Sequence, residues 1–289
     1  MVTASASPPG NSPIRSYKLA VSIVLFHSPI DLLQATCRSL VDAVARARSR
    51  GYLGHCTLLL VDHSGSVDYQ ATVAEMLETT MPRGEIEWQL LASDSNRGYG
   101  HGHNQLAVEQ DTLRLILNPD VELANDALCA GISHFDTNDS AVLASPFVAS
   151  EDGFQEFLCK RYPSVWVLLL RAFAPRRVKN WFSDTLANYE ARDLCCGDRA
   201  VPVPLASGCF MLVRGDSLAH VRGFDERYFL YFEDFDLSLR LADCGELHYV
   251  PSMRIVHHGG NAARKGWRHI AMFLRSGIRF FHQYGWRWA

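Results

Sequence analysis

The chain has 289 residues, which is enough for one large domain or two small ones. Hydrophobic residues make up 48% and charged residues 20%, so the chain can bury a substantial core and is not disordered as a whole. Lys plus Arg number 28 and Asp plus Glu number 31, and this near-balance argues against a general nucleic-acid binder. No uncharged apolar run reaches the roughly 18 residues that a membrane-spanning helix requires.

Residues 1–16 are small, polar and rich in proline, and we expect them to form a disordered leader. They lack the apolar centre of a signal peptide, which favours a cytoplasmic protein. Eight cysteines are scattered without any C-x-x-C pair. A zinc site is therefore not expected, and the cysteines are predicted to be small buried hydrophobes.

Short apolar runs alternate with longer, helix-like segments in the first half of the chain. Each of the first three predicted strands is followed by a predicted helix, and Ser28 is expected to cap the first helix, with Pro29 at its first position. This repetition is typical of a parallel sheet covered by helices. The predicted strands comprise residues 19–26, 56–61, 86–91 and 113–117.

Polar residues follow these strands at their carboxyl ends. They are His27, Asp62, the glycine-rich turn Asn96–Gly102 and the segment Asn118–Asp120. Because the carboxyl ends of parallel strands meet at one edge, and ligands bind beyond that edge, we expect these groups to converge on a binding site.

The second half is less regular, but one helix start is informative. Residues 228–242 are predicted to be an aromatic loop that enters a helix, with Glu233 and Asp234 at its start, where negative charge is favoured. Phe232, Phe235, Leu239 and Ala242 repeat at helical spacing and are expected to face the core. Short strands are predicted at 247–250 and 254–257.

Two acidic segments are candidates for catalysis, although each has an ordinary structural alternative. A carboxylate in Asn118-Pro-Asp-Val-Glu122 could hold Mg²⁺ or Mn²⁺, and the alternative is a turn that leads into the next helix. Apolar surroundings would raise the pKa of Glu233 or Asp234 and make it a better base, and the alternative is helix capping.

Two further segments leave the same choice open. His257 and His258 precede two glycines and could ligate a metal or contact a phosphate, or they could be structural histidines. The turn Asn96–Gly102 could present backbone amides or Arg97 to phosphates, or it could be an ordinary glycine turn.

Taken together, these segments resemble the family 2 glycosyltransferases with a GT-A fold, and most of all their rhamnosyltransferase-like branch. The resemblance covers about residues 17–260 and depends on the order and spacing of its segments. It implies an α/β fold with a Rossmann-like mixed, mainly parallel sheet flanked by helices, over residues 17–262, and a basic-aromatic helix over 263–289. The segments that carry it are Val21-Ser-Ile-Val24, Val61-Asp62, Asn96-Arg-Gly-Tyr-Gly100, Leu117-Asn-Pro-Asp120, Ser207-Gly-Cys-Phe-Met-Leu212, Gly223-Phe-Asp-Glu226, Tyr228–Leu237 and His257-His-Gly-Gly260.

The resemblance also implies a nucleotide-sugar site. Asp62 matches the aspartate that hydrogen-bonds the nucleotide base, and the D-x-D metal motif maps to Asn118–Asp120, with Asn118 in place of its first aspartate. Asp120 is then the main ligand of Mg²⁺ or Mn²⁺, Glu122 is a candidate second ligand, and His257 rather than His258 completes the set. The remaining residues expected to line the donor site are His27, Asn96, Arg97, Gly98, Asn118 and Gly208.

The implied reaction moves a sugar from a nucleotide diphosphate to an acceptor hydroxyl with inversion, and L-rhamnose from dTDP-rhamnose is favoured. Asp234 is expected to be the catalytic base, and Glu233 to help bind the acceptor. A nucleotidyltransferase would normally carry a glycine-rich triphosphate loop, which His27-Ser-Pro29 does not supply. A non-catalytic nucleotide-sugar-binding protein would have no need of Asp234.

Basic and aromatic residues are interleaved in residues 157–183 and 264–289, and neither segment contains an acid. This pattern suits a peripheral membrane face, and the alternative is packing helices with solvated arginines. The acceptor expected from this pattern is a lipid-linked or lipopolysaccharide-type glycan at the cytoplasmic side of the membrane.

Overall fold

The computed structural model describes residues 16–82, 84–93, 95–107, 109, 111–259 and 267–289. The predicted leader lies outside the described residues except for Ser16. The predicted boundary between the glycosyltransferase domain and the C-terminal helix, at residue 262, lies outside them too.

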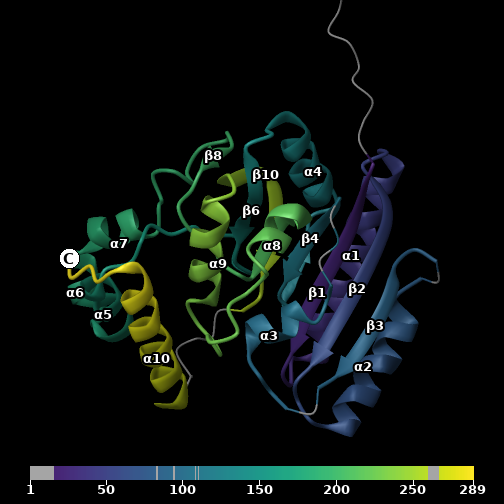
Figure 1. Cartoon of the computed structure of the whole chain (residues 1–289), viewed down its shortest axis with the longest axis horizontal. Helices are drawn as coiled ribbons and strands as arrows, with labels where there is room; N and C mark the ends of the chain where they lie inside the picture. The colour runs from purple at the N-terminus through teal and green to yellow at the C-terminus, as the bar shows by residue number, and fades with distance from the viewer. Residues whose placement is uncertain (1–15, 83, 94, 108, 110, 260–266) are drawn as a thin grey trace, which may run out of the picture.

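A single mixed sheet forms the centre of the molecule (Figure 1). Its main strands lie in the order β3-β2-β1-β4-β9-β6-β10-β5, and β9 and β5 run against the direction of the other six. The mainly parallel α/β architecture predicted from the sequence is confirmed. The strands are β1 (Tyr17–Leu25), β2 (Leu53–Asp62), β3 (Glu87–Ala92), β4 (Thr112–Leu117), β5 (Val121–Leu123), β6 (Ala141–Ala149), β9 (Phe210–Arg214) and β10 (Glu246–His257), with short β7 (Gln155–Glu156) and β8 (Val201–Pro202) at the side.

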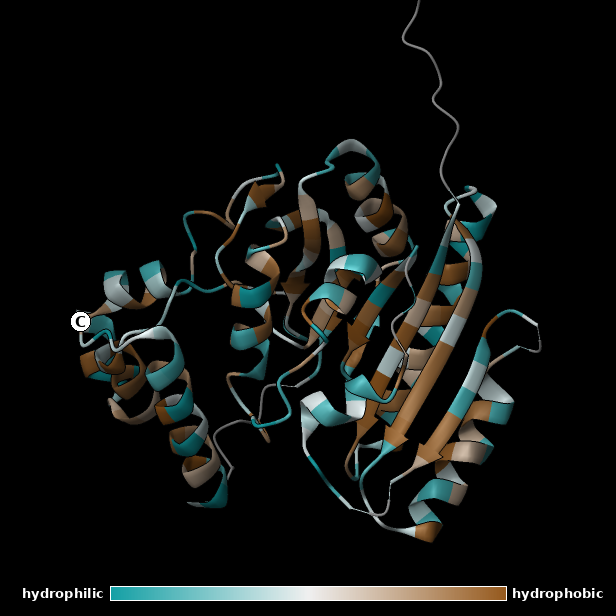
Figure 2. Cartoon of the chain, viewed as in Figure 1, coloured by the Kyte–Doolittle hydropathy of each residue, from teal (hydrophilic) through white to brown (hydrophobic). Residues whose placement is uncertain are grey.

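Helices cover both faces of the sheet, because the central strands are apolar on both faces (Figure 2). One core lies between the sheet and α1 (Ile30–Ser49), α2 (Val67–Thr80) and α4 (Ala127–Thr137). The other lies between the sheet and α8 (Gly215–His220) and α9 (Glu233–Ala242). The helix α3 (Tyr99–Asn104) packs at the carboxyl ends of β1 and β2.

A separate group of helices lies beside α9, on the side away from β1–β3 (Figure 1). It consists of α5 (Val165–Phe173), α6 (Arg176–Trp181), α7 (Ser183–Tyr189) and α10 (Trp267–Tyr284). A third apolar cluster, which includes Phe232, Phe280 and Phe281, joins α10 to α9. The tail after α10 returns to α5, where the backbone N–H groups of Val165 and Trp166 donate to the carbonyl groups of Arg287 and Trp288.

Several predicted details are wrong, each for a local reason. Pro29, not Ser28, is the N-cap of α1, because the Pro29 carbonyl accepts the first helical hydrogen bond, from the Leu33 N–H. The helix α3 begins inside the glycine turn rather than after it. The two short strands predicted at 247–257 are one strand, β10, whose pairing with β6 shifts register between Val250 and Arg254.

The predicted core face of α9 is also only partly right. Leu237 and Leu241 face the sheet, whereas Phe232, Phe235 and Leu239 belong to the cluster that packs against α10. Ala242 is exposed. The helix is covered on two sides, so the stripe that is visible in the sequence marks the contact with α10 rather than the contact with the sheet.

Candidate active site

The predicted polar groups do meet at one edge of the sheet. The strands β1, β2, β4 and β10 run in the same direction, and His27, Asp62, Asn118–Asp120 and His257 stand at or just after their carboxyl ends. In Figure 1 the arrowheads of β1 and β2 point to this edge, where α3 lies. This edge is where an open α/β sheet binds its ligands.

Asp120 and His257 form the centre of the candidate metal site. The Nε2 atom of His257 lies 3.6 Å from Oδ1 of Asp120, and this Oδ1 is buried without a hydrogen-bond partner among the described residues. A Cβ atom on Gly259 would lie 2.3 Å from Oδ2 of Asp120 and 2.7 Å from Nε2 of His257, so glycine keeps this space open. On its far side, Nδ1 of His257 lies 3.2 Å from the Glu156 carboxylate.

Glu122 does not join this pair. In β5 its neighbours Val121 and Leu123 are buried, and alternation turns Glu122 to the other face of the strand. There its carboxylate lies 2.7 Å from Nε2 of His258, whose Nδ1 contacts Glu151 at 2.8 Å. Burial alone would lower the pKa of His258, but the two carboxylates outweigh burial and raise it.

One oxygen ligand and one imidazole fit Mn²⁺ or Mg²⁺, with the nitrogen donor favouring Mn²⁺. Within the described part of the chain, no group of three or more potential ligands surrounds a common point. Asp120 and His257 alone would not fill the coordination shell of such an ion, so further ligands would have to complete it. Metal ligation by this pair, and by Glu122, stays a prediction.

The glycine-rich turn is built to bring the aromatic loop against α3. Asn96 accepts the Gly98 N–H through its own side chain, 3.0 Å away. Gly98 has a φ of 101°, and a Cβ atom there would lie 2.3 Å from the Phe229 carbonyl oxygen, so only glycine fits. Tyr99 then donates its N–H to that carbonyl. Arg97 is exposed, and its guanidinium lies 3.7 Å from Glu226.

Tyr99 links the candidate metal side of the site to the candidate base. Its buried hydroxyl lies 2.6 Å from the Gly208 carbonyl oxygen and 3.1 Å from Oδ1 of Asn118, so its one proton is shared between two acceptors. The Gly208 N–H donates in turn to Oδ2 of Asp234 at 3.0 Å. Burial raises the pKa of Tyr99 well above its ordinary value and keeps it a donor. Gly208, predicted to bind the donor, is therefore also a support for Asp234.

Glu233 and Asp234 stand at the start of α9 in different surroundings. Both oxygens of Asp234 accept backbone N–H groups, from Gly208 and from Phe235. Glu233 is 5% exposed and its Oε2 has no hydrogen-bond partner among the described residues. Burial raises the pKa of both carboxyls, and the Asp234 charge adds to the effect on Glu233. Raised pKa values suit groups that exchange protons near neutral pH.

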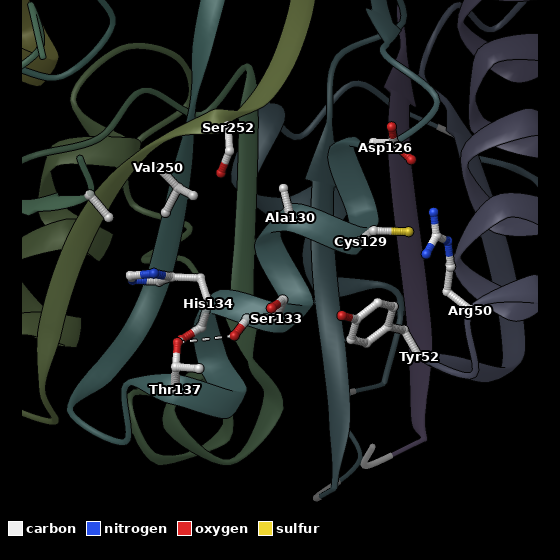
Figure 3. A pocket seen from close by; sticks show the side chains of 11 residues that line it. Arg50, Tyr52, Asp126, Cys129, Ala130, Ser133, His134, Thr137, Val250 and Ser252 are labelled. Atoms are coloured by element: carbon white, nitrogen blue, oxygen red, sulfur yellow. Dashed lines mark hydrogen bonds between the residues drawn. The ribbon is translucent and has the colours of Figure 1, made fainter. Parts of the chain in front are cut away.

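A cavity of about 640 Å³ opens beside this carboxylate pair, within the usual size range of ligand sites. Its walls come from α5, α7, α9 and α10, and Glu233 and Asp234 line it. A different cavity, of about 670 Å³, lies against α4 and near Arg50 and Tyr52, which precede β2 (Figure 3). It is at the amino ends of the strands, and none of the predicted site residues lines it.

Two predicted donor-site residues are engaged elsewhere or exposed. Asp62 is fully buried, and its carboxylate accepts bonds from Ser64 N–H, Ser64 Oγ and Gln70 Nε2. A contact with a nucleotide base stays a prediction. His27 is exposed with a φ of 52°, and its ring centroid lies 5.7 Å from that of Tyr69.

No family model matches the chain. It is 30% identical over 220 residues to the N-acetylglucosaminyl-diphospho-decaprenol L-rhamnosyltransferase of Mycobacterium tuberculosis, and the match covers 69% of each chain. The chain is a rhamnosyltransferase-like family 2 glycosyltransferase. This glycosyltransferase is also 28% identical over 179 residues to the rhamnosyltransferase WbbL of Escherichia coli K12, a match that covers 55% of it and 61% of WbbL.

Solved structures show the same fold for this glycosyltransferase. A crystal structure of GalNAc-T7 with UDP, GalNAc and Mn²⁺ matches with a TM-score of 0.64 and 16% identity over 92% of the chain, which corresponds to 48% of GalNAc-T7. The mannosyltransferase PcManGT of Pyrobaculum calidifontis, in complex with GDP-Man and Mn²⁺, matches with a TM-score of 0.58 and 15% identity over 92% of the chain and 66% of PcManGT. These matches establish the GT-A fold.

Sequence reasoning missed several residues of this glycosyltransferase's site. Tyr99 belongs to one of the motifs that carry the family resemblance, but the sequence predicts no role for it, because its partners Gly208 and Asn118 are distant in sequence. Glu156 lies in the two-residue strand β7, which has no periodic pattern. His101 and His103, to which the sequence assigns no role, are buried and bond to Glu226 and Ser22.

Proposed function

We propose that this glycosyltransferase transfers L-rhamnose from dTDP-rhamnose, with inversion, to a hydroxyl of a lipid-linked or lipopolysaccharide-type glycan precursor. The names of the two relatives support rhamnose as the sugar, and the name of the mycobacterial relative contains a lipid diphosphate acceptor. The proposed place of reaction is the cytoplasmic face of the membrane, where nucleotide-sugars are available. In the described part of the chain, no helix is sufficiently long and apolar to cross a bilayer.

One observation carries the proposal. The Asp234 carboxylate, which borders the cavity between α5, α9 and α10, is connected to the candidate metal site by a short chain of hydrogen bonds. Asp234 lines the cavity and accepts from Gly208, whose carbonyl meets the Tyr99 hydroxyl, which also reaches Asn118. Asn118 is two residues before Asp120. An acceptor in the cavity and a diphosphate at Asp120 would therefore meet across this chain.

The chemistry follows from the position of Asp234. Each of its oxygens keeps a lone pair after the two backbone bonds, so it can accept the proton of an acceptor hydroxyl. As the proton leaves, the hydroxyl oxygen forms a bond to the anomeric carbon, and the bond from that carbon to the diphosphate oxygen breaks on the opposite face. Burial raises the pKa of Glu233 well above its ordinary value and so favours its protonated form, which can donate a hydrogen bond to the acceptor.

A divalent cation at Asp120 and His257 would offset the charge of the leaving diphosphate. The unpartnered Oδ1 of Asp120 and the space beside Gly259 support this site. Glu156 lies behind His257 and can fix the orientation of its ring.

Replacement of Asp234 by asparagine tests the proposed base. Asp234→Asn should lower kcat by about 10²–10⁴, the usual contribution of a positioned base, while the thermal shift produced by dTDP-rhamnose stays as in the wild type. Asp243→Asn, at an exposed position at the end of α9, is the control and should change neither. If kcat of Asp234→Asn equals that of the wild type, Asp234 is not the base.

The donor is tested separately by thermal shift with dTDP-rhamnose and UDP-sugars, each with and without Mn²⁺. A ligand that binds only the folded protein at 100 times its Kd stabilises it by about 2.7 kcal/mol, so the preferred donor should stand out. We expect dTDP-rhamnose with Mn²⁺ to give the largest shift. A larger shift with a UDP-sugar would overturn the choice of donor and leave glycosyl transfer intact.

A further inference from the structure

A second, narrower cavity continues from the carboxylate cavity along α5 and α10. It has a volume of about 100 Å³. Both cavities are bordered by the same six residues, and we call this continuous space the α5–α10 groove. The six shared residues are Leu168, Ala172, Phe173, Phe232, Phe273 and Leu274.

The two ends of the groove differ in polarity. The end at the carboxylate pair contains Arg171, Tyr189 and His269 in addition to Glu233 and Asp234. The other end is lined only by residues without a charged side chain, and it adds Val165, Leu169, Gly277, Ile278, Phe281 and Trp286 to the shared six. A ligand that fills the groove would need one polar, anionic end and one apolar chain.

Arg171 is the only Lys or Arg among the described residues that line the groove. Its guanidinium lies 5.4 Å from the centre of the Tyr189 ring. Asp234 lines the same end of the groove, so this cation and the proposed base border one space.

The apolar part of the groove is open to water in the absence of a ligand. Phe173 is 59% exposed, Leu274 49% and Ile278 50%. Neighbouring exposed apolar side chains of this kind usually mark an interaction site. In addition, Oε2 of Glu233 is buried at the polar end without a partner among the described residues, which indicates that a ligand group belongs there.

We propose that the α5–α10 groove binds the phosphate-linked hydrocarbon chain of the acceptor, with Arg171 contacting the phosphate and the sugar hydroxyl directed to Asp234. This inference rests on the proposed function and adds to it the site and the residue that select a lipid-linked acceptor.

Binding of farnesyl diphosphate tests the groove without any transfer reaction. Calorimetry should show that it binds at least about tenfold more tightly than inorganic diphosphate. Arg171→Gln and Leu274→Asp should each weaken this binding by about tenfold, and both positions are exposed, so folding should be retained. Arg38→Gln and Val67→Asp, exposed on α1 and α2, are the matched controls and should leave binding unchanged.

Transfer to two acceptors then separates this inference from the proposed function. The acceptors are N-acetylglucosamine diphosphates that end in a methyl or a farnesyl group, and kcat/KM should be at least about tenfold higher for the farnesyl acceptor. Equal values for both acceptors, with transfer intact, would overturn the groove and leave the function standing. Binding of farnesyl diphosphate without transfer to either acceptor would overturn the function and leave the groove. If a neutral detergent competes equally and Arg171→Gln has no effect, the groove is a general apolar site and the inference is wrong.

Discussion

Glu233 and Asp234 are neighbours in sequence, and the fold treats them differently. Asp234 has both oxygens satisfied by backbone N–H groups, which partly offset the burial that raises its pKa. Glu233 has a buried oxygen without a partner among the described residues, and burial together with the Asp234 charge raises its pKa further. Such a pair can share one proton, with Asp234 as the base and Glu233 as the acid.

The raised pKa of Glu233 should make the stability of the protein depend on pH. A carboxyl that holds its proton more tightly when folded stabilises the protein below its unfolded pKa, and this contribution is lost as pH rises through the folded value. Gln cannot ionise, so Glu233→Gln should unfold at a higher temperature than the wild type at pH 8 and at nearly the same temperature at pH 4. Each unit of pKa shift corresponds to about 1.4 kcal/mol, which is roughly 3–6 °C for a chain of this size. Thermal unfolding of both proteins between pH 4 and pH 8 measures this difference in melting temperature.

Glu226→Gln is a control in which the expected change in stability has the opposite sign. Burial alone would raise the pKa of Glu226, but its bonds to His101 and Asn104 lower it. This variant should therefore be less stable than the wild type at pH 8, and the difference should shrink as pH falls toward 4. A difference for Glu233→Gln that is constant across pH would show that Glu233 is ionised in the folded protein.

Single residues could be predicted where they lie at the end of a strand or the start of a helix. Asp120 follows β4, His257 ends β10 and Asp234 lies at the start of α9; the fold brings the first two to the expected edge of the sheet, and Asp234 lines the cavity. Tyr99 and Glu156 could not be predicted, because their importance depends on partners that are brought together only by the tertiary fold. The contact of Glu122 with His258 could not be predicted either, because the length of β5, and hence its alternation, is not visible in the sequence.

At the level of elements, the candidate metal site lies at the carboxyl end of β10. His257 is the last residue of the strand, and Gly259 packs against its ring and against Asp120. A methyl group on residue 259 would occupy the space between these side chains and the candidate ion.

Gly259→Ala should therefore abolish the Mn²⁺-dependent part of the thermal shift and lower activity at limiting Mn²⁺ by at least about tenfold. The melting temperature without metal should change little, because the residue lies after the end of the strand. Gly197→Ala is the matched control, since a Cβ atom there meets nothing within 4 Å. A full Mn²⁺-dependent shift in Gly259→Ala would exclude an ion bound between Asp120 and His257.

The parallel elements of the first half were predictable because each strand is a continuous apolar run that ends in a polar turn. The observed strands Leu53–Asp62 and Thr112–Leu117 include the predicted 56–61 and 113–117 and extend them by a few residues. The face of α9 was not predictable in the same way. Its aromatic stripe contacts α10, which is more than thirty residues away in sequence and is not part of the periodic pattern.

At the level of the whole molecule, the helices beside α9 carry an apolar and basic surface. We call it the basic-aromatic surface. Its exposed apolar side chains come from α5, α6, α10 and the tail, which lie together in Figure 1. They include Trp166, Leu169, Phe173, Trp181, Trp267, Ile270, Leu274, Ile278, Trp286 and Trp288, and the basic residues of the same segments include Arg171, Arg176, Arg177, Lys179, Arg268, Arg275, Arg279 and Arg287.

This surface and the α5–α10 groove are formed by the same helices. A lipid-linked acceptor lies with its chain in the bilayer, so an enzyme that binds both the chain and the bilayer surface can take the acceptor without moving the chain through water. The absence of acids from residues 157–183 and 267–289 favours the anionic leaflet. Membrane association is therefore the arrangement in which the groove, the surface and the proposed reaction are consistent with one another.

Flotation with phosphatidylcholine vesicles, with and without phosphatidylglycerol, tests the association. The wild type should float with the anionic vesicles, and less so at high salt, because the charges contribute through screened attraction. A variant with Arg176→Gln, Arg177→Gln and Trp181→Ser should bind at least about thirtyfold less, since each lost charge near the surface costs about 1 kcal/mol. Arg38→Gln with Val67→Ser, on α1 and α2, should float like the wild type. Equal flotation of both variants would remove the basic-aromatic surface as the membrane contact, while the groove, which neither variant touches, would still be tested by farnesyl diphosphate.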